Sequence, residues 1–234
     1  MMKISDQTLE VLKNFSEINT NILVKPGSEL STISTMKNIL AKATITESFD
    51  KQFAIYDLSE LLGIVSAIDK PDIDMANEKF MTVGNAGSKS KAKYFFSDES
   101  VVVSPQKDVI MPDAEVTFQL KNDILAKLMK MAAIMKLPDL SLVGKKGQDV
   151  ILKVHDKKNS ANSYEEFVGT EAAADFTFNF KIENLKIVSG DYDVAVSSQS
   201  ISHFKNKVKP IEYWIALEPD SNTVSYTHLR AHET

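Results

Sequence analysis

LKNDILAKLMKMAAIMK (Leu120–Lys136) and ISDQTLEVLKNFSEIN (Ile4–Asn19) are amphipathic segments that open the two halves of this chain. Apolar residues recur every three or four positions in each, as in a helix with one buried face. The corresponding apolar positions are Ile4 and Leu120, Leu9 and Leu125, Leu12 and Leu128, and Phe15 and Met131. Tyr56–Leu61 is echoed by Phe180–Leu185 at a similar separation of about 120 residues, so we predict a duplicated domain.

Composition limits the class of protein. The 234 residues, 43% hydrophobic and 25% charged, suit two small domains of a soluble globular protein that each bury a core. We find no apolar run long enough to cross a bilayer and no signal peptide, and therefore expect no membrane role. The absence of cysteine excludes disulfides and thiol chemistry and fits a reducing cytoplasm. The net charge of −5 argues against a protein that coats DNA generally, but it allows a local basic surface.

Two segments mark boundaries. Ser104–Pro112 has two prolines and no periodicity, which is typical of a linker. We therefore predict domain 1 at residues 1–103, an interdomain linker at 104–114 and domain 2 at 115–223. The last residues, VSYTHLRAHET (Val224–Thr234), contain the only arginine of the chain and two of its four histidines, and they resemble a translated sequencing adapter. We predict that 224–234 is not native and exclude it from fold and site reasoning.

The local patterns predict an α+β fold of helices on antiparallel strands. Ser5 and either Asp57 or Ser59 are expected to cap two helices, and a third helix is expected over Asn122–Lys136. A short fourth helix is expected over Ile182–Val188, ended by Gly190, and a basic loop over His203–Lys209. Strands are expected at Ile22–Lys25, Glu29–Thr35, Ile39–Thr46, Lys51–Tyr56, Val116–Leu120, Leu140–Val143, Val150–His155, Tyr164–Thr170, Asp175–Phe180, Tyr192–Ser197 and Glu212–Glu218, with further short strands within 72–103.

We find no catalytic constellation. The phosphate-binding Gly-x-x-x-x-Gly-Lys-Ser loop and a His-Glu-x-x-His zinc motif are both absent. His155 and His203 are isolated in sequence, so each is interpreted as a strand or loop residue rather than a base. The acidic pairs Asp72/Asp74 and Glu165/Glu166 are interpreted as solvated loop residues. We therefore expect no enzyme, no metal site and no cofactor.

Lysines on helices are the one functional signal. Lys127 and Lys130 lie three residues apart opposite the apolar face of the third helix, and Lys121 and Lys136 flank them. Only Asp123 offsets this charge. Lys13 and Lys186 are expected on the exposed sides of two other helices. Such a surface could contact phosphates without reading bases, and an ordinary solvated helix face is the alternative.

Five segments resemble one protein family, the sliding clamps (DNA polymerase processivity factors) of T-even-type bacteriophages. They cover most of the chain in the same order and spacing, and they differ mainly at 28–48, 72–103 and 196–210. The segments are LKNFSEIN (12–19), AIYDLSELLGI (54–64), VTFQLKNDILAKLMK (116–130), FTFNFKIENLKIVSGDYDV (176–194) and YWIALEPDS (213–221).

The resemblance implies a DNA-clamp fold of two similar domains, assembled by a homotrimer into a pseudo-sixfold ring around duplex DNA. It also implies that Lys13, Lys121, Lys127, Lys130, Lys136 and Lys186 face the DNA. Its implied partners are the phage DNA polymerase and an ATP-dependent clamp loader, in the cytoplasm of the infected bacterium. Whether late-transcription factors also bind is left open. A pocket for partner peptides is implied near the linker and the final strand, with Val109, Ile110, Met111, Pro112, Leu217 and Pro219 as its candidate lining.

Two other interpretations stay open on the residues alone. One is a phage structural or assembly protein made of duplicated β-rich domains, which would need no lysine-bearing helices. The other is an enzyme whose site is built from loop carboxylates.

Overall fold

The computed structural model describes residues 2–85, 87 and 89–224. The segment predicted to be foreign therefore lies outside the described residues, apart from Val224. The chain divides into two compact units. Unit 1 comprises the chain up to Val109 with Lys186–Val188 and Val208–Trp214, and unit 2 comprises Ile110–Leu185, Ser189–Lys207 and the chain from Ile215. The exact domain and linker boundaries given above remain predictions.

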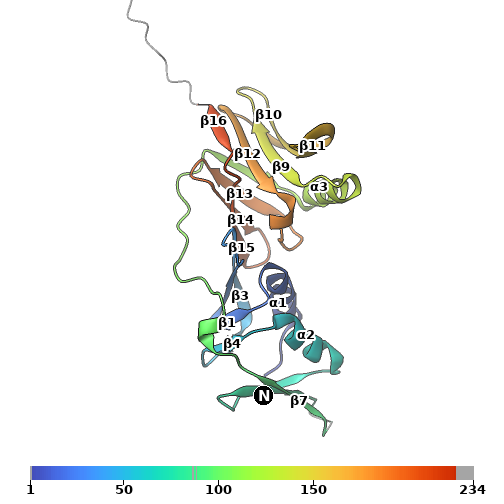
Figure 1. Cartoon of the computed structure of the whole chain (residues 1–234), viewed down its shortest axis with the longest axis vertical. Coiled ribbons are helices and arrows are strands. Elements are labelled where there is room, and N and C mark those ends of the chain that lie inside the picture. The colour runs from blue at the N-terminus through green and yellow to red at the C-terminus, as the bar shows by residue number, and fades with distance from the viewer. Residues whose placement is uncertain (1, 86, 88, 225–234) are drawn as a thin grey trace, which may run out of the picture. The chain divides into compact units, whose positions relative to one another are not determined.

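Unit 1 combines two neighbouring α-helices with short antiparallel strands (Figure 1). Its strands form a two-stranded sheet (β1-β4), a three-stranded sheet (β5-β6-β7) and the series β2-β3-β15. The elements are α1 (Asp6–Ile18), β1 (Ile22–Val24), β2 (Gly27–Ile33), β3 (Ile39–Phe49), β4 (Phe53–Ile55), α2 (Leu58–Ala67), β5 (Asp72–Asp74), β6 (Phe80–Gly84), β7 (Lys91–Phe95), the 3-10 helix η1 (Glu99–Val101), and most of β15 (Ile211–Ala216).

The two helices of unit 1 begin at the predicted caps. The Ser5 hydroxyl accepts a hydrogen bond of 3.2 Å from the Thr8 N–H, and the Asp57 carboxylate accepts one of 2.9 Å from the Glu60 N–H. Each bond satisfies a backbone donor that the first helical turn leaves free. The apolar face of α1 then packs on β2, β3 and α2, and Phe15 is fully buried there. This confirms both caps and the buried stripe of the first helix.

Unit 2 contains one long helix and two groups of antiparallel strands. One group is the sheet β11-β10-β9-β12-β16, and the other is the series β14-β13-β8. The elements are β8 (Val116–Leu120), α3 (Asn122–Met135), β9 (Asp139–Gly144), β10 (Asp149–Asp156), β11 (Asn159–Glu171), β12 (Asp175–Lys181), the 3-10 helix η2 (Ile182–Asn184), β13 (Tyr192–Ser197), β14 (Ile201–Asn206), the end of β15, and β16 (Asn222–Val224).

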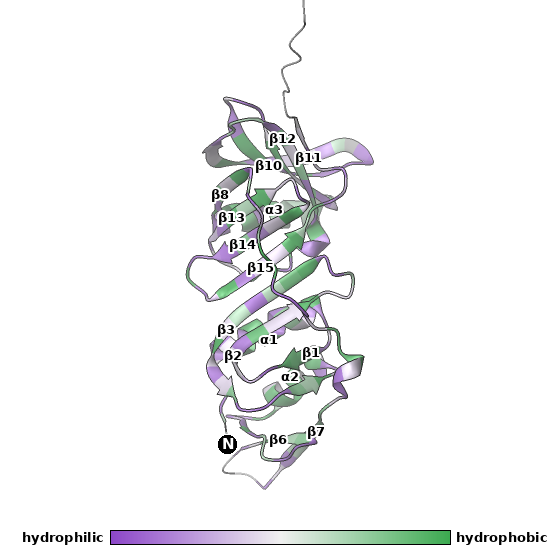
Figure 2. Cartoon of the chain, turned by 90° about the vertical axis from the view of Figure 1, so that its left-hand side faces the viewer, coloured by the Kyte–Doolittle hydropathy of each residue, from purple (hydrophilic) through white to green (hydrophobic). Residues whose placement is uncertain are grey.

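Alternation along the strands builds the core of unit 2. The hydropathy colours of Figure 2 show hydrophilic and hydrophobic residues along both β13 and β14. Val194 and Phe204, which face each other across these strands, are buried. The strands predicted at Leu140–Val143 and Val150–His155 are confirmed, and they form a hairpin in which β9 and β10 pair antiparallel with Leu142 opposite Leu152. Both of these leucines are buried, as expected for strands with one face on a core.

The helix predicted over Ile182–Val188 is wrong, and so is its end at Gly190. Only the 3-10 helix η2 (Ile182–Asn184) forms. The backbone beyond it is engaged by other elements: the Lys186 carbonyl accepts from the Asn14 side chain at 3.0 Å, and the Val188 N–H donates to the Tyr213 hydroxyl at 3.1 Å. Because these tertiary partners satisfy the same groups that a helix would use, the periodic pattern does not produce a helix.

The basic loop predicted over His203–Lys209 is also wrong in its first half. Ile201–Asn206 forms β14, which pairs antiparallel with β13. Ser202 and Asn206 are buried polar residues on this strand, and the Ser202 hydroxyl donates a 2.7 Å hydrogen bond to the Ile215 carbonyl. Polar residues therefore stand at inward positions where a strand pattern requires apolar ones, which concealed the alternation.

Candidate nucleic-acid interface

The helix α3 is held in place from one side and at its start. Leu125, Leu128 and Ala132 are buried on β10 and β11. At the start of the helix, Asp191 accepts a 2.8 Å hydrogen bond from the Asn122 N–H, and the Asn122 side chain accepts one of 2.8 Å from Gly190. These contacts fix which side of α3 faces outward.

All four lysines predicted on this segment are exposed. Lys127 and Lys130 lie within α3, Lys121 is its N-cap, and Lys136 is its C-cap in the left-handed conformation at φ 55°. One carboxylate approaches them from a neighbouring strand: Glu166 on β11 lies 3.7 Å from the Lys127 ammonium. Glu165 and Glu166 therefore lie on a strand, in agreement with the strand predicted at Tyr164–Thr170 and against their interpretation as loop residues. The exposed side of α3 is a basic surface with a local acidic neighbour.

The exposed side of α1 acquires lysines from other parts of unit 1. Lys13 is exposed on the helix itself. Lys209 forms a 2.6 Å ion pair with Glu10, and the Lys186 ammonium donates a 2.7 Å hydrogen bond to the Glu17 carbonyl. Lys186 is thus brought to α1, at Asn14 and Glu17, although it is not on a helix. Lys209 therefore offsets one carboxylate of α1, whereas Lys186 binds a backbone carbonyl near the end of the helix.

Lys209 was missed as a member of this surface. It follows β14 by three residues and precedes β15, and nothing in its local sequence indicates a contact with α1. The chain turn between these strands brings it there, together with Pro210, whose carbonyl accepts a hydrogen bond from Thr44 on β3. Glu10 and Lys209 are 199 positions apart, so no local sequence pattern indicates their contact.

The predicted partner-peptide residues occupy two segments. Val109, Ile110, Met111 and Pro112 lie in a stretch without regular secondary structure, where Ile110 is 88% exposed. Leu217 and Pro219 follow β15; Leu217 is buried, with its N–H bonded to the Ser200 carbonyl at 3.0 Å, and Pro219 is exposed. Their convergence into one pocket stays a prediction.

Both segments are anchored within their own unit. Asp108, next to Val109, pairs with Lys42 on β3, and this pairing lowers the Asp108 pKa and raises the Lys42 pKa. A surface groove of about 370 Å³ lies between this part of the linker and the β1–β3 strands. In unit 2, Asn179 on β12 accepts the Glu218 N–H at 2.8 Å and donates its own N–H to the Ser221 hydroxyl at 2.8 Å.

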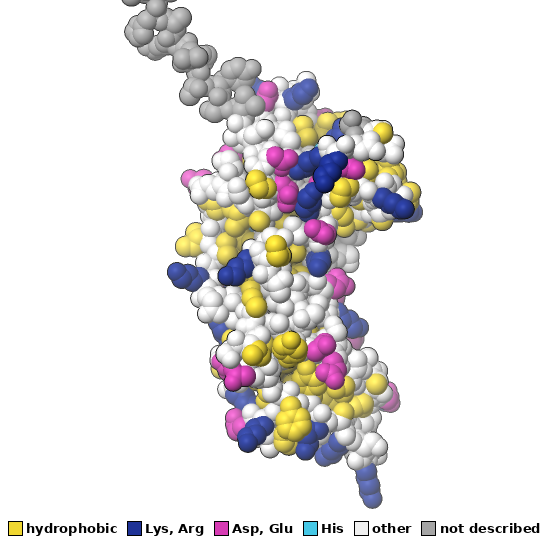
Figure 3. Space-filling model, viewed as in Figure 1, with side chains coloured by type: hydrophobic (Ala, Val, Ile, Leu, Met, Phe, Trp, Pro, Cys, Tyr) yellow, Lys and Arg dark blue, Asp and Glu magenta, His cyan; other side chains and the backbone are white. Residues whose placement is uncertain are grey.

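Charged side chains of both signs alternate over the sheet of unit 2. Figure 3 shows basic and acidic groups side by side over β9 and β12, and further basic groups near α3. The pairs over this sheet are Lys157 with Asp220 at 2.8 Å and Lys181 with Asp139 at 2.5 Å. Because Lys157 and Lys181 are each matched by a carboxylate, this part of the sheet offers less positive charge to a polyanion than α3 does.

The polar contact between Ser141 and His155 resembles part of a catalytic pair but is structural. The Ser141 hydroxyl lies 2.7 Å from His155 Nε2 and donates to Asn179 Oδ1 at 2.6 Å. Ser141 is only 3% exposed, so a substrate cannot reach it. Burial lowers the His155 pKa. The contact therefore links β9, β10 and β12.

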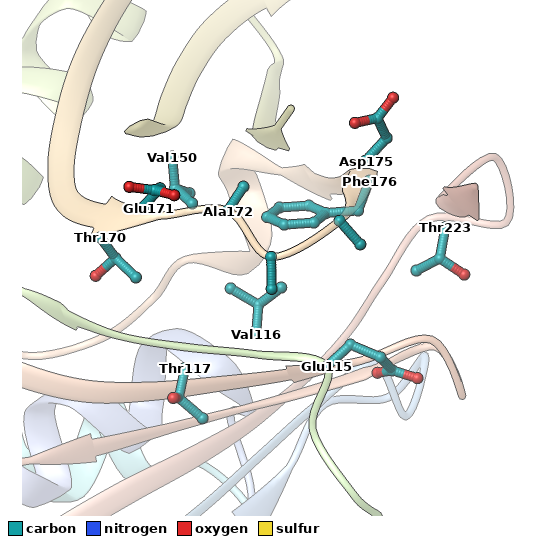
Figure 4. Close-up of a pocket in the computed structure, with 12 residues that line it drawn as sticks. Glu115, Val116, Thr117, Val150, Thr170, Glu171, Ala172, Asp175, Phe176 and Thr223 are labelled. Carbon is teal, nitrogen blue, oxygen red and sulfur yellow. The ribbon is translucent and has the colours of Figure 1, made fainter. Parts of the chain in front are cut away.

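A second groove, of about 520 Å³, opens in unit 2. Figure 4 shows Val116 and Phe176 facing one another across it, with Glu115, Glu171 and Asp175 nearby. Two of these carboxylates are already used: Glu115 accepts the Ser198 N–H at 2.7 Å, and Asp175 accepts the Lys146 N–H at 2.8 Å. Among the described residues no group of three or more acidic or histidine side chains could hold a metal ion. Nor does any described helix have the length and apolar character needed to span a membrane.

The comparisons with known proteins decide the family. The family model of the DNA polymerase processivity factor matches residues 4–104, and the model of the C-terminal part of the gp45 sliding clamp matches 117–219. The sliding clamp of Vibrio phage KVP40 is 35% identical over 224 residues, covering 93% of this chain and 99% of that relative. The chain belongs to the sliding clamp family.

Further matches agree with this assignment. The sliding clamp of Enterobacteria phage T4 is 30% identical over 94% of this chain and 98% of its own length. The Archaeoglobus fulgidus clamp PCNA, solved with the C-terminal region of FEN-1, has a TM-score of 0.69 at 12% identity and covers 95% of this chain and 100% of that one. This likeness shows the DNA-clamp fold of two similar domains.

The clamp is therefore a DNA polymerase processivity factor of the T4-like phage type, and its family resemblance is confirmed. Its relatives act in replication without being enzymes. The alternative of a phage structural or assembly protein is not favoured, because the matching family models and the relatives reported above are sliding clamps or processivity factors.

Proposed function

We propose that this clamp forms a homotrimeric ring around duplex DNA and tethers the phage polymerase, with the lysines of α1 and α3 facing the duplex. One observation carries the proposal: Lys121, Lys127, Lys130 and Lys136 are exposed along α3, whose other side is buried on β10 and β11. Lys13, Lys186 and the newly found Lys209 form the corresponding group at α1.

The chemistry of these groups suits sliding. Lysine ammonium groups attract phosphates as point charges and do not read base edges, so the attraction is independent of sequence. Contacts between exposed charges are weak and are screened by salt over about 8–10 Å. Weak contacts let the ring move along DNA, whereas its closed topology prevents escape. Processivity then needs neither catalysis nor a cofactor, and we propose that the clamp is not an enzyme.

The sheet edges suggest how the ring closes. β7 ends the three-stranded sheet of unit 1, and β11 ends the five-stranded sheet of unit 2. β7 carries Lys91 and Lys93, whereas β11 carries Glu165 and Glu166. Each edge also exposes one aromatic ring, Phe95 at 63% and Phe167 at 60%. Pairing β7 of one copy with β11 of the next would cover both edges and bring opposite charges together.

Such a contact is heterologous, because two different surfaces of the chain meet. Heterologous contacts generate a closed ring when the rotation between copies closes, and an open filament when it does not. We propose closure by three copies. Light scattering should then give three times 26.0 kDa, about 78 kDa. A monomer at every concentration would contradict the ring.

Partner binding is proposed at the linker and the segment after β15. The solved archaeal clamp with the C-terminal region of FEN-1 supports peptide capture by this fold. Peptide binding is favoured in this chain because both segments are anchored. Lys42 pairs with Asp108, next to Val109, and Asn179 accepts the N–H of Glu218, next to Pro219. We propose the phage polymerase and an ATP-dependent loader as partners in the cytoplasm of the infected bacterium. A role in late transcription is a further proposal, as are the domain limits 1–103, 104–114 and 115–223 and the foreign origin of 224–234.

The decisive experiment reverses the charge of two α3 lysines. K127E/K130E should abolish loader-dependent processive synthesis on circular primed DNA while the solution mass stays that of the oligomer. The control is K145E/K146E, which makes the same charge change in the exposed turn between β9 and β10. Unchanged synthesis by K127E/K130E, or an equal loss in the control, would overturn the proposed role of α3.

A further inference from the structure

Glu166 stands apart from the other charged groups near α3. It lies on β11, and its carboxylate is 3.7 Å from the Lys127 ammonium. The Tyr164 hydroxyl donates a hydrogen bond to the same carboxylate. The Glu166 side chain is 19% exposed and the Lys127 side chain 56% exposed. The carboxylate is thus held from its own strand, while the more exposed lysine can turn toward solvent.

The alternation of β11 explains why this residue, and not its neighbour, reaches the helix. Glu166 and Tyr164 lie opposite Leu152 and Val154 of β10, which are buried. This is the face of the sheet on which α3 packs. Glu165 points to the other face, where it forms a 2.8 Å ion pair with its cross-strand partner Lys153. Adjacent glutamates therefore lie on opposite faces of the sheet.

The other lysines of the α3 surface differ from Lys127 because they have no carboxylate partner among the described residues. In the described part of the chain, no ion pair is formed by Lys121, Lys130 or Lys136, so Lys127 alone has a carboxylate within 4 Å. A phosphate that approaches Lys127 must compete with this carboxylate, both for the ammonium and through direct repulsion. The competition weakens one contact of the surface without removing its positive charge.

We propose that Glu166 is a positioning residue that competes with DNA phosphates for Lys127 and so weakens the binding of the clamp to the duplex. The inference rests on the proposed function, because it requires that α3 faces DNA. When Lys127 pairs with Glu166, fewer phosphate contacts must break at each step of the clamp along the duplex. Glu166 thereby favours sliding over static binding.

The test measures binding of the full-length clamp to a short fluorescent duplex by anisotropy, over a series of salt concentrations. E166Q should tighten binding about two- to fivefold at low salt, the range expected when one exposed ion pair is lost. The slope of log affinity against log salt should become steeper by up to about 0.9, the value for one additional phosphate contact. A change in folding alone would not steepen that slope.

Three variants serve as controls for E166Q and separate the role of Glu166 from a general effect of charge. E78Q removes the same charge from another pair that also spans 3.7 Å, Lys51 with Glu78 in unit 1, and should leave both quantities nearly unchanged. E166D keeps the charge but draws it back from Lys127, so it should tighten binding by a smaller factor. In a K127Q background, E166Q should no longer tighten DNA binding, because the ammonium for which Glu166 and the phosphate compete has been removed.

The possible failures are distinguishable. If E78Q and E166Q tighten binding equally, the effect is a general loss of negative charge and the inference is overturned. If E166Q acts equally well in the K127Q background, direct repulsion of phosphate explains it and the role of Lys127 is overturned. If neither K127Q nor K130Q weakens binding, the proposed DNA-facing role of α3 fails, and the inference fails with it.

Discussion

The Tyr213 hydroxyl donates a 2.8 Å hydrogen bond to the Asn14 side chain and so joins β15 to α1 inside unit 1. The same hydroxyl accepts the Val188 N–H, and the Asn14 amide donates to the Lys186 carbonyl. Tyr213 is completely buried. One buried pair therefore orients α1 and places Lys186 beside it.

Removing this hydroxyl should destabilise the clamp. Y213F leaves the side-chain oxygen Oδ1 of Asn14 and the Val188 N–H without their shared partner, and an unsatisfied buried polar group costs about 1–3 kcal/mol. Denaturant unfolding should show a loss of this size. Y56F, at a tyrosine that is 61% exposed, is the control and should change the free energy of unfolding by less than about 0.5 kcal/mol. Equal effects of the two variants would contradict the role assigned to the buried pair.

The ion pair between Asp139 and Lys181 should make stability depend on pH at the acid end. Burial opposes ionisation of Asp139, but the Lys157 N–H and the Lys181 ammonium outweigh it, so its pKa lies below the ordinary 3.8. The unfolded chain then binds the proton more readily than the folded one. The stabilisation is complete above pH 3.8 and is lost as the pH falls through the folded-state pKa.

D139N tests this linkage. At neutral pH it should lower the free energy of unfolding by about 1–3 kcal/mol, because Lys181 loses its charged partner. The difference from the unmodified clamp should shrink as the pH falls below 3.8. The same substitution at the exposed Asp50 should change stability by less than about 0.5 kcal/mol. A D139N difference that stayed constant down to acid pH would rule out the proposed linkage.

Two glycines should respond to alanine in opposite directions. A Cβ on Gly144 would lie 2.3 Å from the Phe176 ring and 2.9 Å from the Ala172 side chain, so G144A should cost about 1–3 kcal/mol through overpacking. A Cβ on Gly63 of α2 meets nothing within 4 Å, and G63A should stabilise by about 0.5–1 kcal/mol through helix propensity. Thermal unfolding of both variants should give a lower unfolding temperature for G144A and a higher one for G63A. A stable G144A would show that the space around Phe176 adapts.

The proposed contact between β7 and β11 should depend on its two exposed rings. F95K and F167K each place a charge where two sheet edges would meet, and each should shift the solution mass toward a single chain. M36K, at an 81% exposed methionine in the turn between β2 and β3, is the control and should keep the oligomer. An oligomer that survives both phenylalanine substitutions would show that other surfaces join the copies.

The sequence predicts the regular elements well where one local signal controls them. The caps at Ser5 and Asp57, the apolar stripe of α3 and the hairpin between β9 and β10 follow from residues only a few positions apart. The prediction fails where distant groups intervene. Ile182–Val188 has a helical pattern, yet Asn14 and Tyr213 bind its backbone, and buried Ser202 conceals β14.

By itself, the sequence determined the fold class, the family and the lysines along α3, because helix periodicity and family resemblance are carried by the order of residues along the chain. Only the tertiary structure placed Lys209 and Lys186 at α1 and Glu166 beside Lys127. The reason is physical: attraction between charges depends on their distance in space, and folding joins residues such as Glu10 and Lys209, which no local pattern connects.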